Sequence, residues 1–289
     1  MEVKKFLDYN ICSLTFKEAK EKIVEFLRDD KKRVITPINP EKIVKSLSDE
    51  KLKNILLNSD LLLPDGYGII IASKFLGIKI KERITGIDMF EALIDYADKN
   101  NLSIYFLGAT EDSVKGVVER VKKEFNGVKI AGYHNGFFTD YKDVIDDLKN
   151  KKIDILFVAM GTPKQEYFIY DNLEYINAKI SMGVGGSFDV FSGRIKRAPK
   201  LIRDLGLEWL YRFILEPKKR FPRVITLFKF IFIVLKERLK FGKSWYYWNS
   251  CWQFNSRRGN RKIDKIHRRE KVSFRFHIKF WKCNEGFWK

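Results

Sequence analysis

The residue whose position most clearly indicates chemistry is Asp65, a single carboxylate between two aliphatic runs in the stretch "LLLPDGYGIIIA". Three leucines before Pro64 are typical of the end of a buried strand, and proline cannot donate a hydrogen bond inside a sheet. Gly66 and Gly68 relax the backbone where a helix could begin. Two interpretations remain open: Asp65 either serves a ligand in the crevice at the carboxyl end of the strand or only caps the next helix.

Four further apolar runs end in glycine, in "FLGAT" (106–110), "HNGFF" (134–138), "MGTPKQE" (160–166) and "GVGGSFD" (183–189). Glycine lets a ligand approach the backbone closely, and the amide groups at a helix N-terminus favour a phosphate. None of these turns is a complete dinucleotide-binding or Walker sequence, so each one alone is weak evidence. Their repetition at one edge of a sheet favours a nucleotide diphosphate as the ligand.

The elements that must position these residues alternate from Arg33 onward between short apolar runs and stretches of helical period. This alternation predicts an α/β fold with a mostly parallel, Rossmann-like sheet flanked by helices, and we expect residues 1–195 to form this catalytic domain. The expected strands are 33–39, 59–66, 103–109, 128–136, 153–161 and 178–186, and the expected helices are 40–58, 85–100, 111–125, 141–150 and 163–173.

Positive charge is concentrated in the C-terminal part of the chain. The net charge is +19, and residues 212–289 hold 22 Lys and Arg against 5 Asp and Glu. A basic, aromatic region beside a nearly neutral body indicates a polyanionic partner, either an anionic membrane or nucleic acid. Three widely spaced cysteines indicate neither a disulfide framework nor a zinc site, and they fit a reducing cytoplasm. The N-terminal sequence contains no apolar region typical of a signal peptide.

Residues 196–243 are expected to form a basic, amphipathic helical appendage that binds the membrane. Pro217 and Pro222 are expected to break this appendage into short helices. The apolar core of this segment, residues 224–235, would be about 18 Å long as a helix, too short for about 30 Å of hydrocarbon. Lys229, Lys236 and Lys240 share one helical face, which suits a helix lying in the membrane interface. The alternative is a core helix with a solvated basic edge. Residues 244–289, rich in Trp, Arg and Lys, allow no structural assignment.

Seven motifs occur along the chain in the order "ITPINPEKIV", "LLLPDGYGI", "KERITGIDMF", "FLGATEDS", "HNGFF", "AMGTPKQE" and "MGVGGSFDVFSGRIKRAPKLIRDLGLEWLYR". Together they closely resemble the WecG/TagA/CpsF family of bacterial glycosyltransferases, over about residues 1–241. The resemblance implies an inverting, metal-independent and cofactor-free transfer from a UDP-sugar to undecaprenyl-diphosphate-linked N-acetylglucosamine. The donor would be UDP-N-acetylmannosamine, as in wall teichoic acid synthesis, although relatives also use its uronic acid or glucose.

The resemblance also implies catalytic roles. Asp65 matches the aspartate thought to be the general base of the family, and Gln165 matches a glutamine assigned to the site. Arg83, beside an expected helix start, is the first candidate to stabilise the leaving UDP. Thr36 and Asn39, at another strand end, either bond the sugar or only serve the turn and helix cap before Pro40.

Weaker predictions complete the site. His134 is interpreted as structural, and Glu166 as a side chain that only favours the start of its helix. The expected UDP-sugar contacts are Gly108, Asn135, Gly136, Phe137, Gly161, Gly185 and Asp189. The expected cations of the appendage, which would stabilise the leaving group near the membrane, are Arg212, Arg220 and Arg223.

The expected partners are the UDP-sugar, the lipid-linked acceptor, an anionic membrane surface and a second copy of the chain, but not nucleic acid. The expected location is the inner face of the cell membrane, reached from the cytoplasm. Two other classes of protein are alternatives: a nucleotide-dependent oxidoreductase or epimerase, for which residues 33–42 lack the glycine fingerprint, and a non-enzymatic peripheral membrane protein.

Overall fold

The computed structural model describes residues 2–138, 140–199, 201–202, 206, 208–215 and 217–258; within these, nothing is described of the side chains of 209, 212, 215, 218–220 and 241–258. The chain divides into two compact units, Met1–Glu237 and Arg238–Lys289. The sheet, its covering helices and the candidate site all belong to the first unit. The domain boundaries expected after residues 195 and 243 remain predictions.

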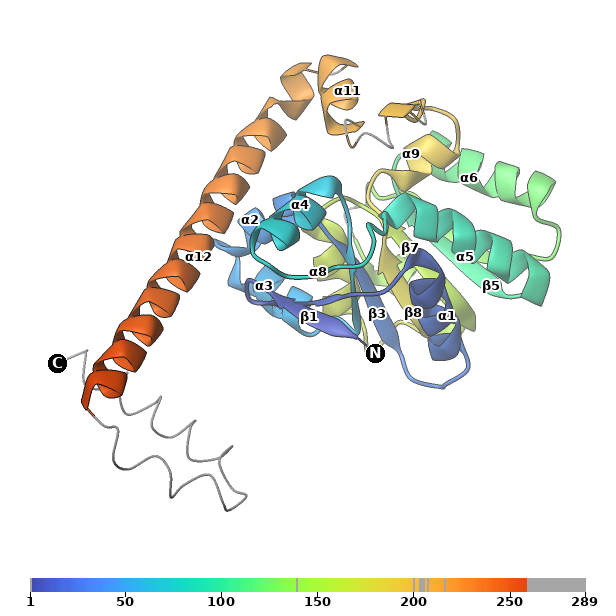
Figure 1. The fold of residues 1–289 in the computed structure, drawn as a ribbon. Helices are drawn as coiled ribbons and strands as arrows, with labels where there is room; N and C mark the ends of the chain where they lie inside the picture. Colours follow the sequence, from blue (N-terminus) through green and yellow to red (C-terminus); the bar gives the residue numbers. More distant parts are fainter. Residues whose placement is uncertain are drawn as a thin grey trace. The chain divides into compact units, whose positions relative to one another are not determined.

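The core of the first unit is an eight-stranded sheet with the strand order β1-β2-β4-β3-β8-β7-β5-β6 (Figure 1). Only β1 and β2 pair antiparallel, so the prediction of a mostly parallel α/β sheet is confirmed. The N-terminal hairpin was not predicted because it precedes the strand and helix alternation. The strands are β1 (Val3–Phe6), β2 (Tyr9–Cys12), β3 (Arg33–Ile38), β4 (Leu61–Pro64), β5 (Ser103–Gly108), β6 (Lys129–His134), β7 (Ile153–Ala159) and β8 (Ala178–Gly183).

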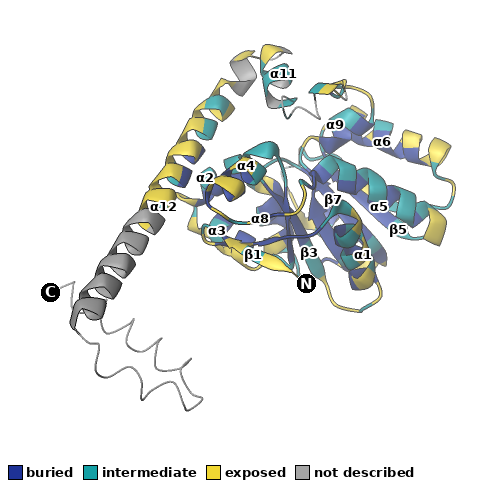
Figure 2. Cartoon of the chain, viewed as in Figure 1, coloured by how far each residue is buried: buried dark blue, intermediate teal, exposed yellow. Residues whose placement is uncertain are grey.

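Helices cover both faces of this sheet because its central strands bury side chains in both directions. In β5, Ile104 and Phe106 enter one apolar cluster while Tyr105 and Leu107 enter another. Figure 2 shows the resulting buried layer between the helices. One face carries α1 (Phe16–Leu27), α5 (Gly86–Asn100), α6 (Glu111–Glu124) and α9 (Ser187–Phe191), and the other carries α2 (Pro40–Ser46), α3 (Glu50–Leu57), α4 (Tyr67–Phe75), α7 (Lys142–Asn150) and α8 (Lys164–Asp171).

The single helix expected over residues 40–58 is wrong, because two helices occupy this segment. Helix α2 ends at Ser46 with Leu47 as its C-cap, and Asp49 caps α3 by accepting a hydrogen bond from the Leu52 amide at 2.9 Å. An aspartate that satisfies a free amide at a helix start favours a new helix over continuation of the old one. Asn39 caps α2 in the same way and accepts from the Lys42 amide at 3.0 Å.

The C-terminal helices also differ from expectation. Pro217 and Pro222 were expected to break this region into short helices, yet α12 begins at Pro217 and continues through Pro222 to Arg258. Pro217 is the first residue of the helix, where its missing N–H removes no backbone hydrogen bond. Pro222, the sixth residue, removes one such bond, and packing of Phe230 against Phe6 supports the helix farther along. Helix α12 therefore also includes residues 244–258. It follows α11 (Glu208–Leu215).

Helix α12 has two apolar sides within the first unit. Phe230 and Val234 are buried, and the Phe230 ring lies 6.4 Å from that of Phe6 in β1. The helix also exposes a set of large apolar side chains spaced three and four residues apart, at one helical period. This exposed stripe consists of Phe221, Ile225, Phe228, Phe232 and Leu235. Among the described residues, no helix has the length and apolar character that a membrane span requires.

Candidate active site

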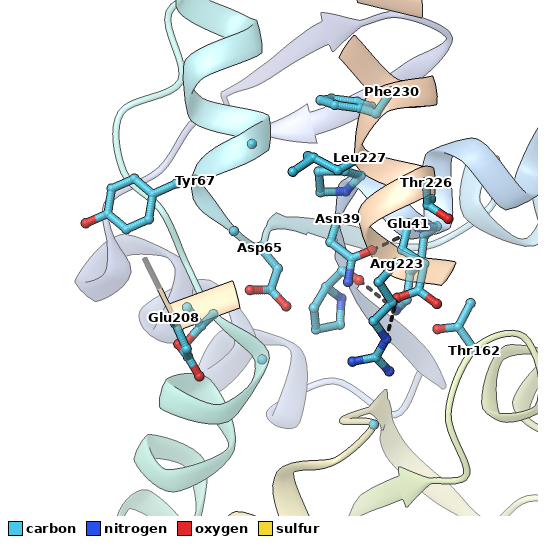
Figure 3. A pocket seen from close by; sticks show the side chains of 18 of the residues that line it. Asn39, Glu41, Asp65, Tyr67, Thr162, Glu208, Arg223, Thr226, Leu227 and Phe230 are labelled. Atoms are coloured by element: carbon cyan, nitrogen blue, oxygen red, sulfur yellow. Dashed lines mark hydrogen bonds and ion pairs between the residues drawn. The ribbon is translucent and has the colours of Figure 1, made fainter. Parts of the chain in front are cut away.

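A cavity of about 980 Å³ opens at the carboxyl ends of β3, β4, β7 and β8. The N-terminus of α5, the start of α11 and the inner side of α12 complete its wall. Figure 3 shows Asp65 in this cavity, with Tyr67 and Glu208 to one side and Asn39, Glu41 and Arg223 to the other. The carboxyl edge of a parallel sheet is where open α/β folds bind ligands, so this cavity is the candidate active site.

The sheet holds Asp65 at the end of β4. Its amide donates to the Ile38 carbonyl at 2.9 Å, and the Pro64 carbonyl accepts from the Ile84 amide at 2.9 Å. The N-cap of α4 is Gly66, with φ of 90°, and no side chain caps that helix. The interpretation of Asp65 as only a helix cap is therefore inconsistent with the structure.

Burial raises the pKa of Asp65 from its ordinary value of 3.8 to about 6. The positive charges of Lys42 and Arg83 and a hydrogen bond from the Gly86 amide oppose this rise, whereas the negative charge of Glu208 adds to it. A carboxylate with this pKa is mostly ionised at neutral pH and still binds a proton strongly. These are the properties that a general base needs.

Gln165 joins two loops of the cavity wall. Its Oε1 accepts hydrogen bonds from the Gly161 amide at 3.2 Å and the Gly185 amide at 3.0 Å, and its Nε2 donates to Glu166 at 2.8 Å. A Cβ on Gly183 would lie 2.6 Å from Gln165 Nε2, so a side chain at this position would displace the Gln165 amide. Gln165 thus positions the loops that follow β7 and β8. Three residues predicted for the site meet here: Gln165, Gly161 and Gly185.

A buried ion pair includes Lys42, which lines the cavity. Lys42 Nζ is 2.8 Å from Glu166 Oε1 and donates to the Pro37 carbonyl at 2.7 Å, and both charged side chains are buried. Burial opposes ionisation of Glu166, but Lys42 and the Gln165 hydrogen bond outweigh it and lower the pKa of Glu166. Glu166 therefore does more than favour the start of α8. Sequence reasoning missed Lys42, which has the pattern of a solvated helix lysine.

Tyr67 lies on one side of the cavity wall, which residues after the α/β body complete. The Arg83 guanidinium lies 4.4 Å from the centre of the Tyr67 ring. Gly206, with φ of 74°, packs against the same ring so closely that a Cβ would lie 2.8 Å from it. Glu208 begins α11 and lines the cavity. Sequence reasoning missed Tyr67 and Glu208, although both fall in the motifs quoted for the family.

Of the three arginines predicted in the appendage, Arg223 is described and lines the cavity. Its Nε lies 3.4 Å from Glu41, which also pairs with Lys45 at 2.9 Å. The side chains of Arg212 and Arg220 lie outside the described residues.

The other predicted residues lie away from the cavity wall. Thr36 is buried and shares a hydrogen bond of 2.9 Å with Ser59, so its hydroxyl serves the strand end. Asp189 accepts from the Ser113 hydroxyl at 2.7 Å at the start of α6. His134 packs against the Phe138 ring at 5.3 Å, in keeping with a structural role.

A group of glycines and polar residues gathers at the ends of β5 and β6. The Gly136 amide donates to the Ala109 carbonyl at 2.8 Å, directly beyond Gly108. Asn135 donates to Glu111 at 2.8 Å and accepts from the Phe137 amide at 2.8 Å, and Phe137 is 78% exposed. Because β7 lies between β5 and β8, this group continues the same sheet edge beyond the cavity.

The site combines a carboxylate of raised pKa with nearby cations at the carboxyl edge of a parallel sheet. Sites of this kind occur in α/β enzymes that transfer a group and release an anionic leaving group. The glycosyl transferase WecG/TagA/CpsF family matches residues 4–244. The chain belongs to this family and is a glycosyltransferase. The resemblance noted in the sequence is confirmed.

Two curated relatives support this membership. The N-acetylglucosaminyldiphosphoundecaprenol N-acetyl-beta-D-mannosaminyltransferase of Bacillus spizizenii strain W23 is 36% identical over 221 residues, which cover 76% of this chain and 86% of the relative. The protein of the same name from Bacillus subtilis strain 168 is 39% identical over 213 residues, covering 74% of this chain and 82% of the relative.

Proposed function

We propose that this protein transfers N-acetylmannosamine from UDP-N-acetylmannosamine to undecaprenyl-diphosphate-linked N-acetylglucosamine, in wall teichoic acid synthesis. Both relatives carry a name that specifies an N-acetylmannosaminyl transfer to this lipid acceptor. The observation that supports the chemistry most directly is Asp65, which lines the cavity with a pKa raised to about 6. Family membership leaves no support for the oxidoreductase or non-enzymatic alternatives.

In the proposed reaction, Asp65 takes the proton from the acceptor hydroxyl while the hydroxyl oxygen attacks the anomeric carbon. The new bond forms on the face opposite UDP, so the configuration inverts, and the electron pair of the broken bond leaves with the diphosphate. Arg83 and Arg223, which both line the cavity, stabilise the charge that develops on the leaving group. Asn39 lines the cavity as well as capping α2, so it can also bond a sugar.

The donor nucleotide is proposed to lie along the edge of the sheet, from the cavity toward β5 and β6. Gly161 and Gly185 allow close approach beside Asp65, and Gly108 and Gly136 do so farther along. The exposed ring of Phe137 offers a surface for the uracil. Asp189 accepts one hydrogen bond from Ser113 through Oδ1, and its carboxylate can accept a further bond from the nucleotide.

Release of UDP by the purified protein tests the proposed reaction. We expect release only when UDP-N-acetylmannosamine and a short-chain lipid-diphosphate-N-acetylglucosamine are both present. Release should continue in EDTA, because protein cations and amide donors are proposed to replace a metal. UDP-N-acetylmannosaminuronic acid and UDP-glucose, tested in parallel, distinguish the alternative donors. An enzyme that works only with one of these donors would overturn the donor assignment, and loss of activity in EDTA would overturn metal independence.

Binding at the inner face of the cell membrane is proposed to use the exposed stripe of α12. Phe228 and Phe232 are 68% and 69% exposed, and Lys229 and Lys236 beside them are exposed cations. Apolar side chains bordered by lysines suit an anionic bilayer surface. Replacing both phenylalanines with glutamate should reduce flotation with anionic vesicles at least tenfold, because about 3 kcal/mol of apolar transfer is lost.

The double variant Tyr170→Glu/Tyr175→Glu is the matched control, because it removes two exposed aromatic rings of 47% and 52% exposure elsewhere and adds the same charge. Its flotation should remain close to that of the wild type. Equal flotation of both double variants would contradict the assignment to α12. A change of oligomeric state in the α12 variant, without a change in flotation, would assign the stripe to a second copy of the chain.

A further inference from the structure

The buried pair of Lys42 and Glu166 has no substrate-binding role in the reaction proposed above. Lys42 is 4% exposed and Glu166 3% exposed, and Lys42 Nζ is already bound to Glu166 and to the Pro37 carbonyl. The Lys42 ammonium is therefore fixed in place and cannot reach out to a ligand. Its position on the cavity wall still brings its charge close to Asp65.

The pair is costly as a stabilising device. Taking two charges out of water costs several kcal/mol per ion, and apolar residues of similar size often stabilise a fold at least as well. Glu166 Oε2 is also buried and, within the described part of the chain, has no hydrogen-bond partner. Buried charges with incomplete hydrogen bonding beside a catalytic cavity indicate a functional reason for the pair.

We propose that Lys42 and Glu166 form a charge-setting pair for Asp65, in which Lys42 keeps the base ionised and Glu166 limits how strongly it does so. This inference rests on the proposed function, in which Asp65 is the base. Lys42 pairs directly with Glu166, lines the same cavity as Asp65 and acts on Asp65 electrostatically. Because Glu166 holds Lys42 by a direct ion pair of 2.8 Å, only part of the effect of the ammonium reaches Asp65.

The neighbouring charges do not provide the same control. Arg83 also favours the ionised form of Asp65, but it stacks on Tyr67 and is assigned to the leaving group. Glu208 acts in the opposite direction, from α11. The Gly86 amide of α5 bonds Asp65 directly, but carries no charge that a side-chain change can remove. The remaining charged residues of the cavity wall are Glu41, Lys45 and Arg223.

The pH profile of kcat/KM tests the pair, because its acidic limb reports ionisation of the free enzyme's base. Lys42→Met should move this limb upward by about one pH unit, since an opposite charge is lost. Activity should then recover at about pH 8.5, where Asp65 ionises without help. Glu166→Gln should move the limb downward, because the whole effect of Lys42 is then available to Asp65. Opposite shifts from the two variants are the expected signature.

Lys42→Met leaves Glu166 buried without its partner, so this variant can lose stability as well. The double variant Lys42→Met/Glu166→Gln removes both charges and keeps the side-chain volumes. The acidic limb of this double variant should lie at a higher pH than that of the wild type, as it should in Lys42→Met alone. Lys42→Arg, which keeps the charge, should restore the wild-type limb if it folds. Limbs that coincide in all folded variants, with only stability altered, would show a purely structural pair and overturn the proposal.

A second readout separates this inference from the proposed reaction. The carboxyl carbon-13 resonance of Asp65, assigned by its loss in Asp65→Asn, reports the titration of Asp65 without substrate. We expect the same opposite shifts of the titration midpoint in Lys42→Met and Glu166→Gln. Shifts in an enzyme that fails to transfer the sugar would support the charge-setting pair and count against the transfer. Sugar transfer by an enzyme whose Asp65 titration midpoint does not move in the variants would support the proposed reaction and count against the charge-setting pair.

Discussion

Replacing Asp65 with asparagine is expected to reduce sugar transfer by about 10²- to 10⁴-fold, the usual contribution of a general base. Asparagine keeps the shape and the hydrogen bond from the Gly86 amide but cannot take the proton of the acceptor. Initial rates of acceptor-dependent UDP release measure the loss. Asp146→Asn, the same change at an exposed position of α7, is the matched control and should leave the rate unchanged. Full activity of Asp65→Asn would remove Asp65 from the mechanism.

The same change should make the folded protein more stable at neutral pH. The pKa of Asp65 is about 6 in the folded state and 3.8 in the reference state, so the folded protein binds this proton more tightly. Stability from Asp65 is therefore complete below about pH 4 and is lost as pH rises through 6. Asparagine does not ionise, so the variant keeps this stability, and its free energy of unfolding at pH 7.5 should exceed that of the wild type by about 1–3 kcal/mol.

Denaturant unfolding of both proteins at pH 4 and pH 7.5 measures this effect. The increase in the free energy of unfolding of Asp65→Asn over the wild type should be larger at pH 7.5 than at pH 4, by about 1–3 kcal/mol. A variant that is less active and equally destabilised at both values would indicate a structural aspartate. The expected combination of lower activity with higher stability is typical of a catalytic group held where its charge is unfavourable.

Gly108→Ala is expected to lower the free energy of unfolding by about 3–5 kcal/mol. Gly108 ends β5 with φ of 121°, and a Cβ there would lie 2.5 Å from the Ala159 carbonyl carbon of β7. Both the backbone angle and the contact exclude a side chain, so the two strands must separate at the edge that carries the site. Equilibrium unfolding in urea measures the loss.

Gly77→Ala separates these two causes. Gly77 also has a positive φ, 74°, but among the described residues no atom lies within 4 Å of an added Cβ. It should therefore lose only about 1 kcal/mol, from backbone strain. Equal losses for the two variants would show that the close approach of β5 to β7 does not limit residue 108.

The covering of the sheet by helices on both faces follows from the sequence, because strand and helix periodicity are local properties. The placement of Asp65 was also predictable, since Pro64 and Gly66 end the strand within two residues. The local pattern did not show the division of residues 40–58, where the Asp49 side chain competes with continuation of α2. It also did not show that Pro222 lies within a continuous helix, because packing of Phe230 against β1 stabilises that helix from a distance.

The sequence alone thus established the parallel α/β fold, the family and the base candidate at the end of a strand. The partners of that base follow only from the tertiary structure, because electrostatic effects depend on distances between elements that are remote in the chain. Lys42, Glu166 and Glu208 resemble solvated helix residues in the sequence. Folding pairs Lys42 with Glu166 and brings the charges of Lys42 and Glu208 close enough to act on Asp65. Thr36 and Asn39, equivalent as candidates, separate because Thr36 lies inside β3 and bonds Ser59, whereas Asn39 follows the strand, caps α2 and lines the cavity.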